Sequence, residues 1–62
     1  MDSIVTVYAE PISAHKGKVT AYAVTKVDDE GMPVDTCNVW DCAMSEVVNE
    51  CNVNGWELIV KD

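Results

Sequence analysis

The sequence has no lysine or arginine anywhere in residues 27–60, although that stretch holds eight of its eleven acidic residues. The formal net charge of the 62-residue chain is −7. A segment with one sign of charge repels nucleic-acid phosphates and anionic lipids, and it attracts basic surfaces. Direct binding to DNA, RNA or a membrane is therefore disfavoured. The expected partner is a basic protein surface, such as that of a nucleic-acid-binding protein, although an acidic surface also serves plain solubility.

Long apolar runs are also missing. No stretch approaches the roughly 20 apolar residues that a membrane-spanning helix needs. The first three residues, Met1, Asp2 and Ser3, carry no positive charge of the kind that begins a signal peptide. We therefore expect a cytoplasmic location, which is the host cytoplasm if a phage encodes the chain.

Catalytic motifs are scarce. The single histidine, His15, falls in a predicted hairpin loop, far along the chain from any cysteine that it could activate. Phosphate-binding glycine loops, nucleotide fingerprints and paired carboxylates for acid–base chemistry are absent. The sequence thus predicts a non-enzymatic protein without a cofactor.

The three cysteines, Cys37, Cys42 and Cys51, are an odd number near one predicted helix. An odd set favours reduced thiols over a disulfide scaffold. Together with His15 they could be counted as four zinc ligands, but their spacing lacks the close ligand pairs of structural zinc sites. We expect no metal, with Cys37 and Cys51 as small core residues and Cys42 as the exposed thiol.

A chain of this length forms one domain, residues 1–62, and buries only about 60% of its unfolded surface. Residues 4–14 and 18–27 are rich in Val, Thr, Tyr and Ile, and Gly17 permits a short hairpin loop between them. Residues 34–40 fit either an extended segment or the first turn of a helix. A helix is expected from Asp41, as its N-cap, to Asn54, where Gly55 ends it before a strand over residues 56–60.

These elements predict an α+β fold of β-β-α-β order, with a three-stranded antiparallel sheet of order 2-1-3 and one helix on one face. We expect the small residues Ala9, Ala21 and Ala23 to lie beneath the helix. The opposite face is then unusually apolar, and such a patch typically marks an interface. Self-association as a homodimer and docking to another protein are both open, as is shielding of the patch by long side chains. The predicted interface residues are Tyr8, Tyr22, Val24 and Ile59, with Ile4 beside them.

The end of the predicted helix resembles a known sequence pattern. Residues 47–60 are similar to small uncharacterised bacterial and phage domains in which a short helix ends in a Gly-Trp-Glu-Leu strand start, here Gly55, Trp56, Glu57 and Leu58. In size and charge the chain also resembles phage-encoded inhibitors, including anti-CRISPR proteins, that occupy the basic groove of a nucleic-acid-binding enzyme.

The resulting hypothesis is a small acidic protein-interaction module, acting as an inhibitor of a nucleic-acid-binding defence or host protein. The residues expected to contact the basic partner are Asp28, Asp29, Glu30, Glu46 and Glu50. The alternative hypothesis is a small-ligand-binding or accessory domain that uses a cleft near Trp40 and Trp56.

Overall fold

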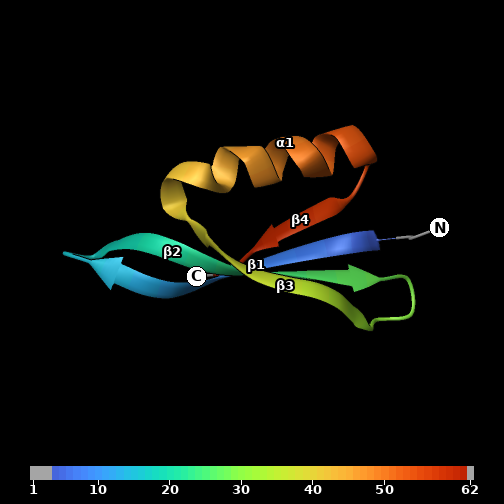
Figure 1. Ribbon diagram of the computed structural model, residues 1–62, viewed down its shortest axis with the longest axis horizontal. Helices are drawn as coiled ribbons and strands as arrows, with labels where there is room; N and C mark the ends of the chain where they lie inside the picture. Colours follow the sequence, from blue (N-terminus) through green and yellow to red (C-terminus); the bar gives the residue numbers. More distant parts are fainter. Residues whose placement is uncertain (1–3, 62) are drawn as a thin grey trace.

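The computed structural model describes residues 4–61, so the predicted lack of a signal segment at residues 1–3 lies outside the described residues. One helix, α1, lies on one side of a four-stranded mixed sheet with strand order β3-β2-β1-β4 (Figure 1). The predicted α+β class with a single helix is confirmed. In chain order the elements are β1 (Ile4–His15), β2 (Lys18–Asp28), β3 (Pro33–Trp40), the 3₁₀ turn η1 (Asp41–Ala43), α1 (Met44–Asn54) and β4 (Glu57–Val60).

The predicted three-stranded antiparallel sheet is wrong in two respects. Residues 34–40 belong to a strand, β3, which pairs antiparallel with β2. The last strand pairs with β1, as expected, but runs parallel to it. The second error follows from the first, because an added antiparallel strand reverses the chain once more before the helix. β3, α1 and β4 thus form a crossover that carries the chain from one edge of the sheet to the other.

The β2–β3 connection is held by Asp28. Its Oδ1 atom accepts hydrogen bonds from the backbone N–H groups of Glu30 and Met32, both at 2.9 Å. The backbone adds a 3.1 Å hydrogen bond from Gly31 N–H to the Asp28 carbonyl, and Gly31 has a φ of 84°. An aspartate that bonds its own following backbone stabilises a tight turn, so the acidic sequence here forms a connection between two antiparallel strands.

The helix begins later than predicted. Asp41 does not cap α1: residues 41–43 form the 3₁₀ turn, and the N-cap position is Ala43, which makes no side-chain capping hydrogen bond. The predicted end is confirmed, because α1 stops at Asn54 and Gly55 has a left-handed φ of 73°. The Gly55 N–H donates to the carbonyl of Cys51. Glycine adopts this conformation without a Cβ clash, which explains the sharp stop.

The core lies between α1 and the central strands. Its buried members are Val7 and Ala9 from β1, Val24 from β2 and Cys51 from α1. Around them pack partly buried residues of every strand and of the helix, namely Ile4, Tyr22, Val39, Met44, Val47, Trp56 and Leu58. The prediction that Cys51 is a core residue is therefore confirmed.

The predicted faces of β2 are inverted. The β1–β2 loop consists of Lys16 and Gly17, and beyond two register shifts near Ser13 the odd-numbered residues 7–11 of β1 pair with even-numbered residues of β2. Ala9 therefore pairs with Val24, and both point toward α1. Contrary to expectation, Tyr22 and Val24 lie on the helix side, with Ile4 packed against the same core. Ala23 and Ala21, in turn, lie on the opposite side, which we call the open face.

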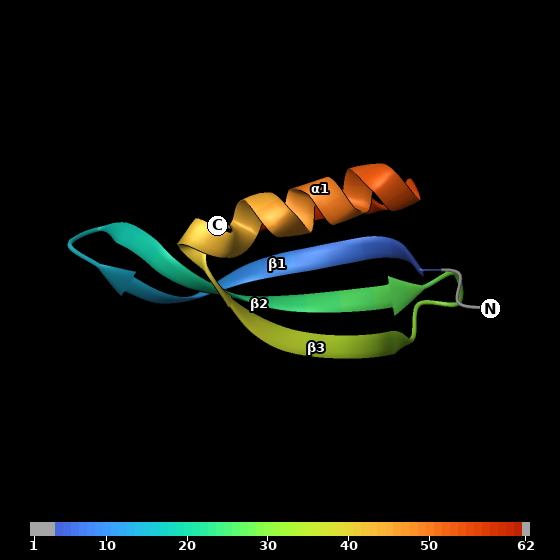
Figure 2. The same ribbon diagram turned by 45° about the horizontal axis from the view of Figure 1, so that its top comes forward.

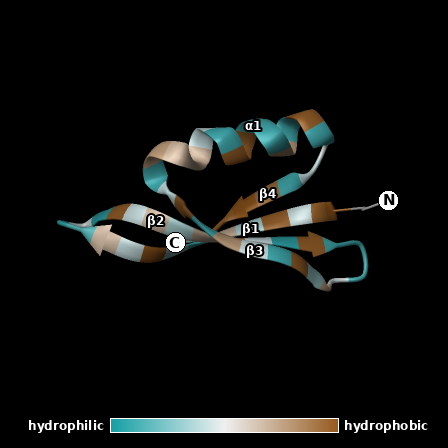
Figure 3. Cartoon of the chain, viewed as in Figure 1, coloured by the Kyte–Doolittle hydropathy of each residue, from teal (hydrophilic) through white to brown (hydrophobic). Residues whose placement is uncertain are grey.

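The molecule is elongated, with extents of 40 × 21 × 16 Å. The β1–β2 hairpin projects beyond the helix at one end, and the β2–β3 turn lies at the other end (Figure 1). Both connections are hydrophilic (Figure 3). Within residues 4–61, no helix is long and apolar enough to cross a membrane.

Candidate functional site

Strand β3 is the part of the sheet that the helix leaves uncovered. Viewed obliquely, α1 runs above β1 while β3 lies at the far side of the sheet (Figure 2). Seven of the eight β3 residues are exposed, and only Val39 is half-buried. A space therefore remains beside the helix on the same side of the sheet, bordered by β3.

This space is the α1–β3 groove, which we define by Val39, Ala43, Glu46, Val47 and Glu50. These residues line a hollow of about 260 Å³. Val39 and Val47 make it apolar, whereas the two glutamates, one helical turn apart, place carboxylates along its helix side. Such a combination suits a side chain with an aliphatic stem and a cationic head, which is the chemistry of lysine and arginine.

One basic residue approaches the groove from below. Lys26 Nζ lies 3.4 Å from Glu50 Oε1 and 5.6 Å from the centre of the Trp56 ring. The Lys26 side chain is only 22% exposed, and its contacts with Glu50 and with the Trp56 ring fix the position of its ammonium group. This is the one ion pair within residues 4–61, and it partly neutralises Glu50. Glu46 thus carries the groove's unpaired negative charge in the part of the chain that the structure describes.

The predicted acidic surface is not a single cluster. Glu46 and Glu50 lie beside Val39, near the end of β3, whereas Asp28, Asp29 and Glu30 belong to the turn that precedes β3. Val39 and Pro33 are six residue steps apart along β3, which corresponds to roughly 20 Å, whereas Glu50 reaches Lys26, nearer the turn. Of the three acidic residues at the turn, Asp28 is half-buried and its carboxylate accepts the hydrogen bonds of the turn, whereas Asp29 and Glu30 are exposed.

Asp35 lies between these two groups of acidic residues, and the sequence analysis did not identify it as a candidate contact residue. It pairs with Lys26, whose side chain reaches Glu50, so Asp35 lies on the helix side of β3 between the turn and the groove. Its position follows from strand alternation, which places Asp35, Cys37 and Val39 on one face. Recognising residues 34–40 as a strand would have been sufficient to find it.

The open face holds two of the four predicted interface residues, Tyr8 and Ile59, which are register partners. Lys61 Nζ lies 5.3 Å from the centre of the Tyr8 ring. Tyr22 and Val24 are excluded from this face, and Val24, at 1% exposure, cannot contact a partner. Two other residues are more accessible: Ile12 (50% exposed), which the sequence did not single out, and Trp40 (68%), which was predicted to border a ligand cleft.

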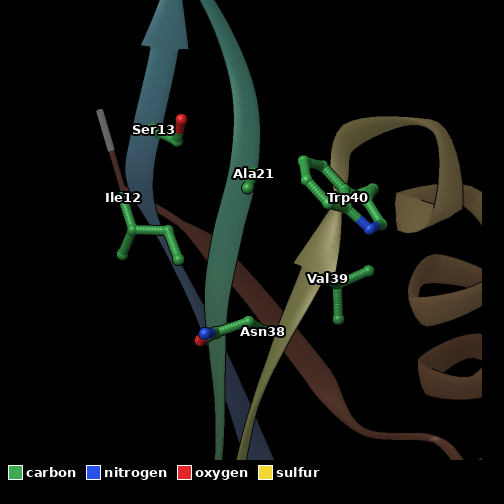
Figure 4. A pocket seen from close by; sticks show the side chains of 6 residues that line it. All are labelled: Ile12, Ser13, Ala21, Asn38, Val39 and Trp40. Atoms are coloured by element: carbon green, nitrogen blue, oxygen red, sulfur yellow. The ribbon is translucent and has the colours of Figure 1, made fainter.

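Ile12 and Trp40 border a second hollow of about 260 Å³ (Figure 4). It arises where the β1–β2 register shifts near Ile12. The remaining lining residues are Ser13, Ala21, Asn38 and Val39. Trp40 precedes α1 and Trp56 follows it, so the two indoles lie near opposite ends of the helix. Of the two tryptophans near which a cleft was predicted, only Trp40 lines this hollow.

The reactive side chains are dispersed. Cys42 is exposed, as predicted, but Cys37 is exposed as well, because it lies on the uncovered strand β3 and not in the core. Burial raises the pKa of the Cys51 thiol, and the nearby Glu50 carboxylate raises it further, against a smaller lowering by Lys26. Residues 4–61 contain no cluster of three His, Cys, Asp or Glu side chains arranged to hold a metal ion.

Comparison of the chain with protein-family models, with curated proteins and with solved structures found no significant match.

Proposed function

We propose that this chain is a non-enzymatic interaction module that binds a basic protein surface through the α1–β3 groove. The observation that carries the proposal is the juxtaposition of an apolar hollow with the unpaired Glu46 carboxylate and the nearby Asp35. Charge complementarity of this kind accelerates encounter with cationic partners and disfavours anionic ones. The finer proposal is that the partner is a nucleic-acid-binding defence or host protein, whose basic groove a phage-encoded, anti-CRISPR-like inhibitor would occupy.

Charge reversal at Glu46 tests this proposal. The assay measures displacement of labelled DNA or RNA from a panel of basic nucleic-acid-binding proteins, either in a cytoplasmic extract of the host or with purified components. For a protein from which the wild-type chain displaces nucleic acid, the concentration of the Glu46→Lys variant needed for the same displacement should be about tenfold higher. The substitution exchanges an attractive charge contact for a repulsive one.

The matched control is Glu57→Lys. Glu57 is also exposed, but it pairs with Thr6 and lies on the open face, outside the groove. Because the open face is also the proposed dimer surface, the solution mass of both variants is compared with that of the wild type. The two variants have the same net charge, so a general charge effect would weaken both equally. Equal losses would contradict a role for the groove, and so would unchanged competition by the Glu46 variant.

We also propose that the chain forms a homodimer through the open face. Ile12, Trp40, Tyr8 and Ile59 give this face more exposed apolar surface than a solvated sheet requires. Light scattering on a size-exclusion column under reducing conditions should give twice the monomer mass at both low and high salt. Trp40→Ser should reduce the mass toward that of a monomer, whereas a wild-type monomer at micromolar concentration would contradict the proposal.

The second candidate function is small-ligand binding at the hollow beside Trp40. Its volume of about 260 Å³ lies just below the usual range for ligand sites, which begins at about 300 Å³. Because Trp40 lines this hollow and Trp56 does not, a ligand at this site would change the fluorescence of the wild-type protein but not that of a Trp40→Phe variant.

A further inference from the structure

Strand β3 forms an edge of the sheet that lacks the usual protection. In the part of the chain that the structure describes, it pairs on one side only, with β2, whereas the opposite edge is formed by the four-residue β4. Edge strands are normally protected by lysines, prolines, bulges or a covering element, because their free N–H and C=O groups pair with other chains. β3 has one proline, Pro33, at its start, and its register with β2 is regular from Asp35 to Trp40.

The side chains of β3 form two rows of different character. On the helix side Asp35, Cys37 and Val39 adjoin the α1–β3 groove, where Glu46 lies. On the open face the row contains Thr36 and Asn38 and ends at the exposed Trp40. An added strand would lie about 4.8 Å from β3, with its own side chains alternating between these two environments.

We propose that the β3 edge and the α1–β3 groove together receive an extended segment of a basic partner, which becomes a fifth strand of the sheet. This inference rests on the proposed function and names the form in which the partner binds. Lysines or arginines at alternate positions of the segment face Asp35 and Glu46. Apolar residues at the intervening positions face the open side, where Trp40 contacts them. Backbone hydrogen bonds then supply affinity, and the alternation supplies specificity.

Electrostatics favours a basic segment over a second copy of β3 at this edge. Pairing two β3 strands would bring together two copies of Asp35 and Glu46, on chains that each carry a net charge of −7. A dimer formed through the open face leaves the backbone groups of the β3 edge free, but it competes with the added strand for contact with Trp40.

The experiment uses the full chain and a synthetic peptide of the length of β3 that alternates lysine with valine. Three control peptides have the same residue composition. In one the lysines are grouped at one end, and in the other two the backbone nitrogens are methylated at alternate positions, one peptide for each of the two possible registers. Affinity is measured by titration at fixed salt, and amide hydrogen exchange of β3 is followed by NMR with and without each peptide.

The alternating peptide should bind at least about tenfold more tightly than the peptide with grouped lysines and than one of the methylated registers, because methylation removes several strand hydrogen bonds. It should also slow exchange of the outward-facing β3 amides. Equal affinity for all peptides, or unchanged β3 exchange, would overturn strand addition. If Glu46→Lys still weakens those equal affinities, the proposed function survives and only its form is wrong. Slowed exchange in the peptide-free protein that depends on protein concentration would instead assign the edge to a second copy.

Discussion

The Val24→Asp variant is expected to be unfolded at room temperature. Val24 is 1% exposed and packs with Val7, Ala9 and Cys51 beneath the helix. Removing this side chain from the core costs about 1.5–3 kcal/mol, and an unpaired buried carboxylate adds several more. A domain of 62 residues has a total free energy of unfolding of only about 3–5 kcal/mol. The substitution therefore exceeds the available stability.

Thr25→Asp is the matched control for this variant. Thr25 is the next residue of β2, pairs with Tyr8, and lies on the open face. The same charge placed there does not enter the core, so for the monomer it should lower the free energy of unfolding by only about 1 kcal/mol, the range of strand propensities. Circular dichroism melts of the two variants measure the difference. If Val24→Asp melted like Thr25→Asp, the hairpin register that directs Val24 toward α1 would be contradicted.

The second large effect is expected in thiol reactivity. An aromatic disulfide reagent should modify Cys37 and Cys42 rapidly and Cys51 at least about a hundredfold more slowly. The first two side chains are exposed, whereas Cys51 is 3% exposed and its raised pKa reduces the thiolate fraction. Absorbance of the released thiol should therefore show two fast equivalents and one slow one. Denaturant should make all three fast, and three fast equivalents in the native protein would contradict the placement of Cys51.

The same thiol gives the domain an alkaline limit. The pKa of Cys51 is raised in the folded chain above its ordinary value of 9.0, so the folded state retains the proton at a pH where the unfolded state has lost it. This contribution to stability is fully present below pH 9 and is lost as the pH rises through the folded pKa. Urea midpoints should accordingly fall above pH 9 in the wild type, and fall less in Cys51→Ala.

The sequence predicted those parts of the fold that depend on local conformation. Gly55 ends the helix because only its backbone adopts the left-handed turn without strain, and this can be inferred from one residue. The pairing of the last strand with the first was also predicted. By contrast, Cys37, Trp40 and Met44 have the spacing of one helical face, whereas the structure places Cys37 and Trp40 in a strand, on opposite faces of the sheet. Pairing with β2 decides between helix and strand, and that interaction is non-local.

The candidate site was predicted to a similar degree and for similar reasons. Glu46 and Glu50 lie on α1, whose helical character was clear, so their common placement was correct. Asp35 was not identified because its strand was not recognised. The error for Tyr22 and Val24 has a different origin, since shifting the hairpin pairing by one residue moves a whole row of side chains to the other face.

The projecting β1–β2 hairpin gives the molecule a preferred orientation during diffusion. Its tip carries Lys16 and Lys18, while Asp29 and Glu30 lie in the turn at the other end of the 40 Å axis. This separation is several times the screening length of about 8 Å at physiological salt, so an approaching surface senses one end at a time. A cationic surface repels the hairpin tip and attracts the acidic end. For the proposed basic partner, encounters that begin at the acidic end are therefore favoured over those that begin at the hairpin tip.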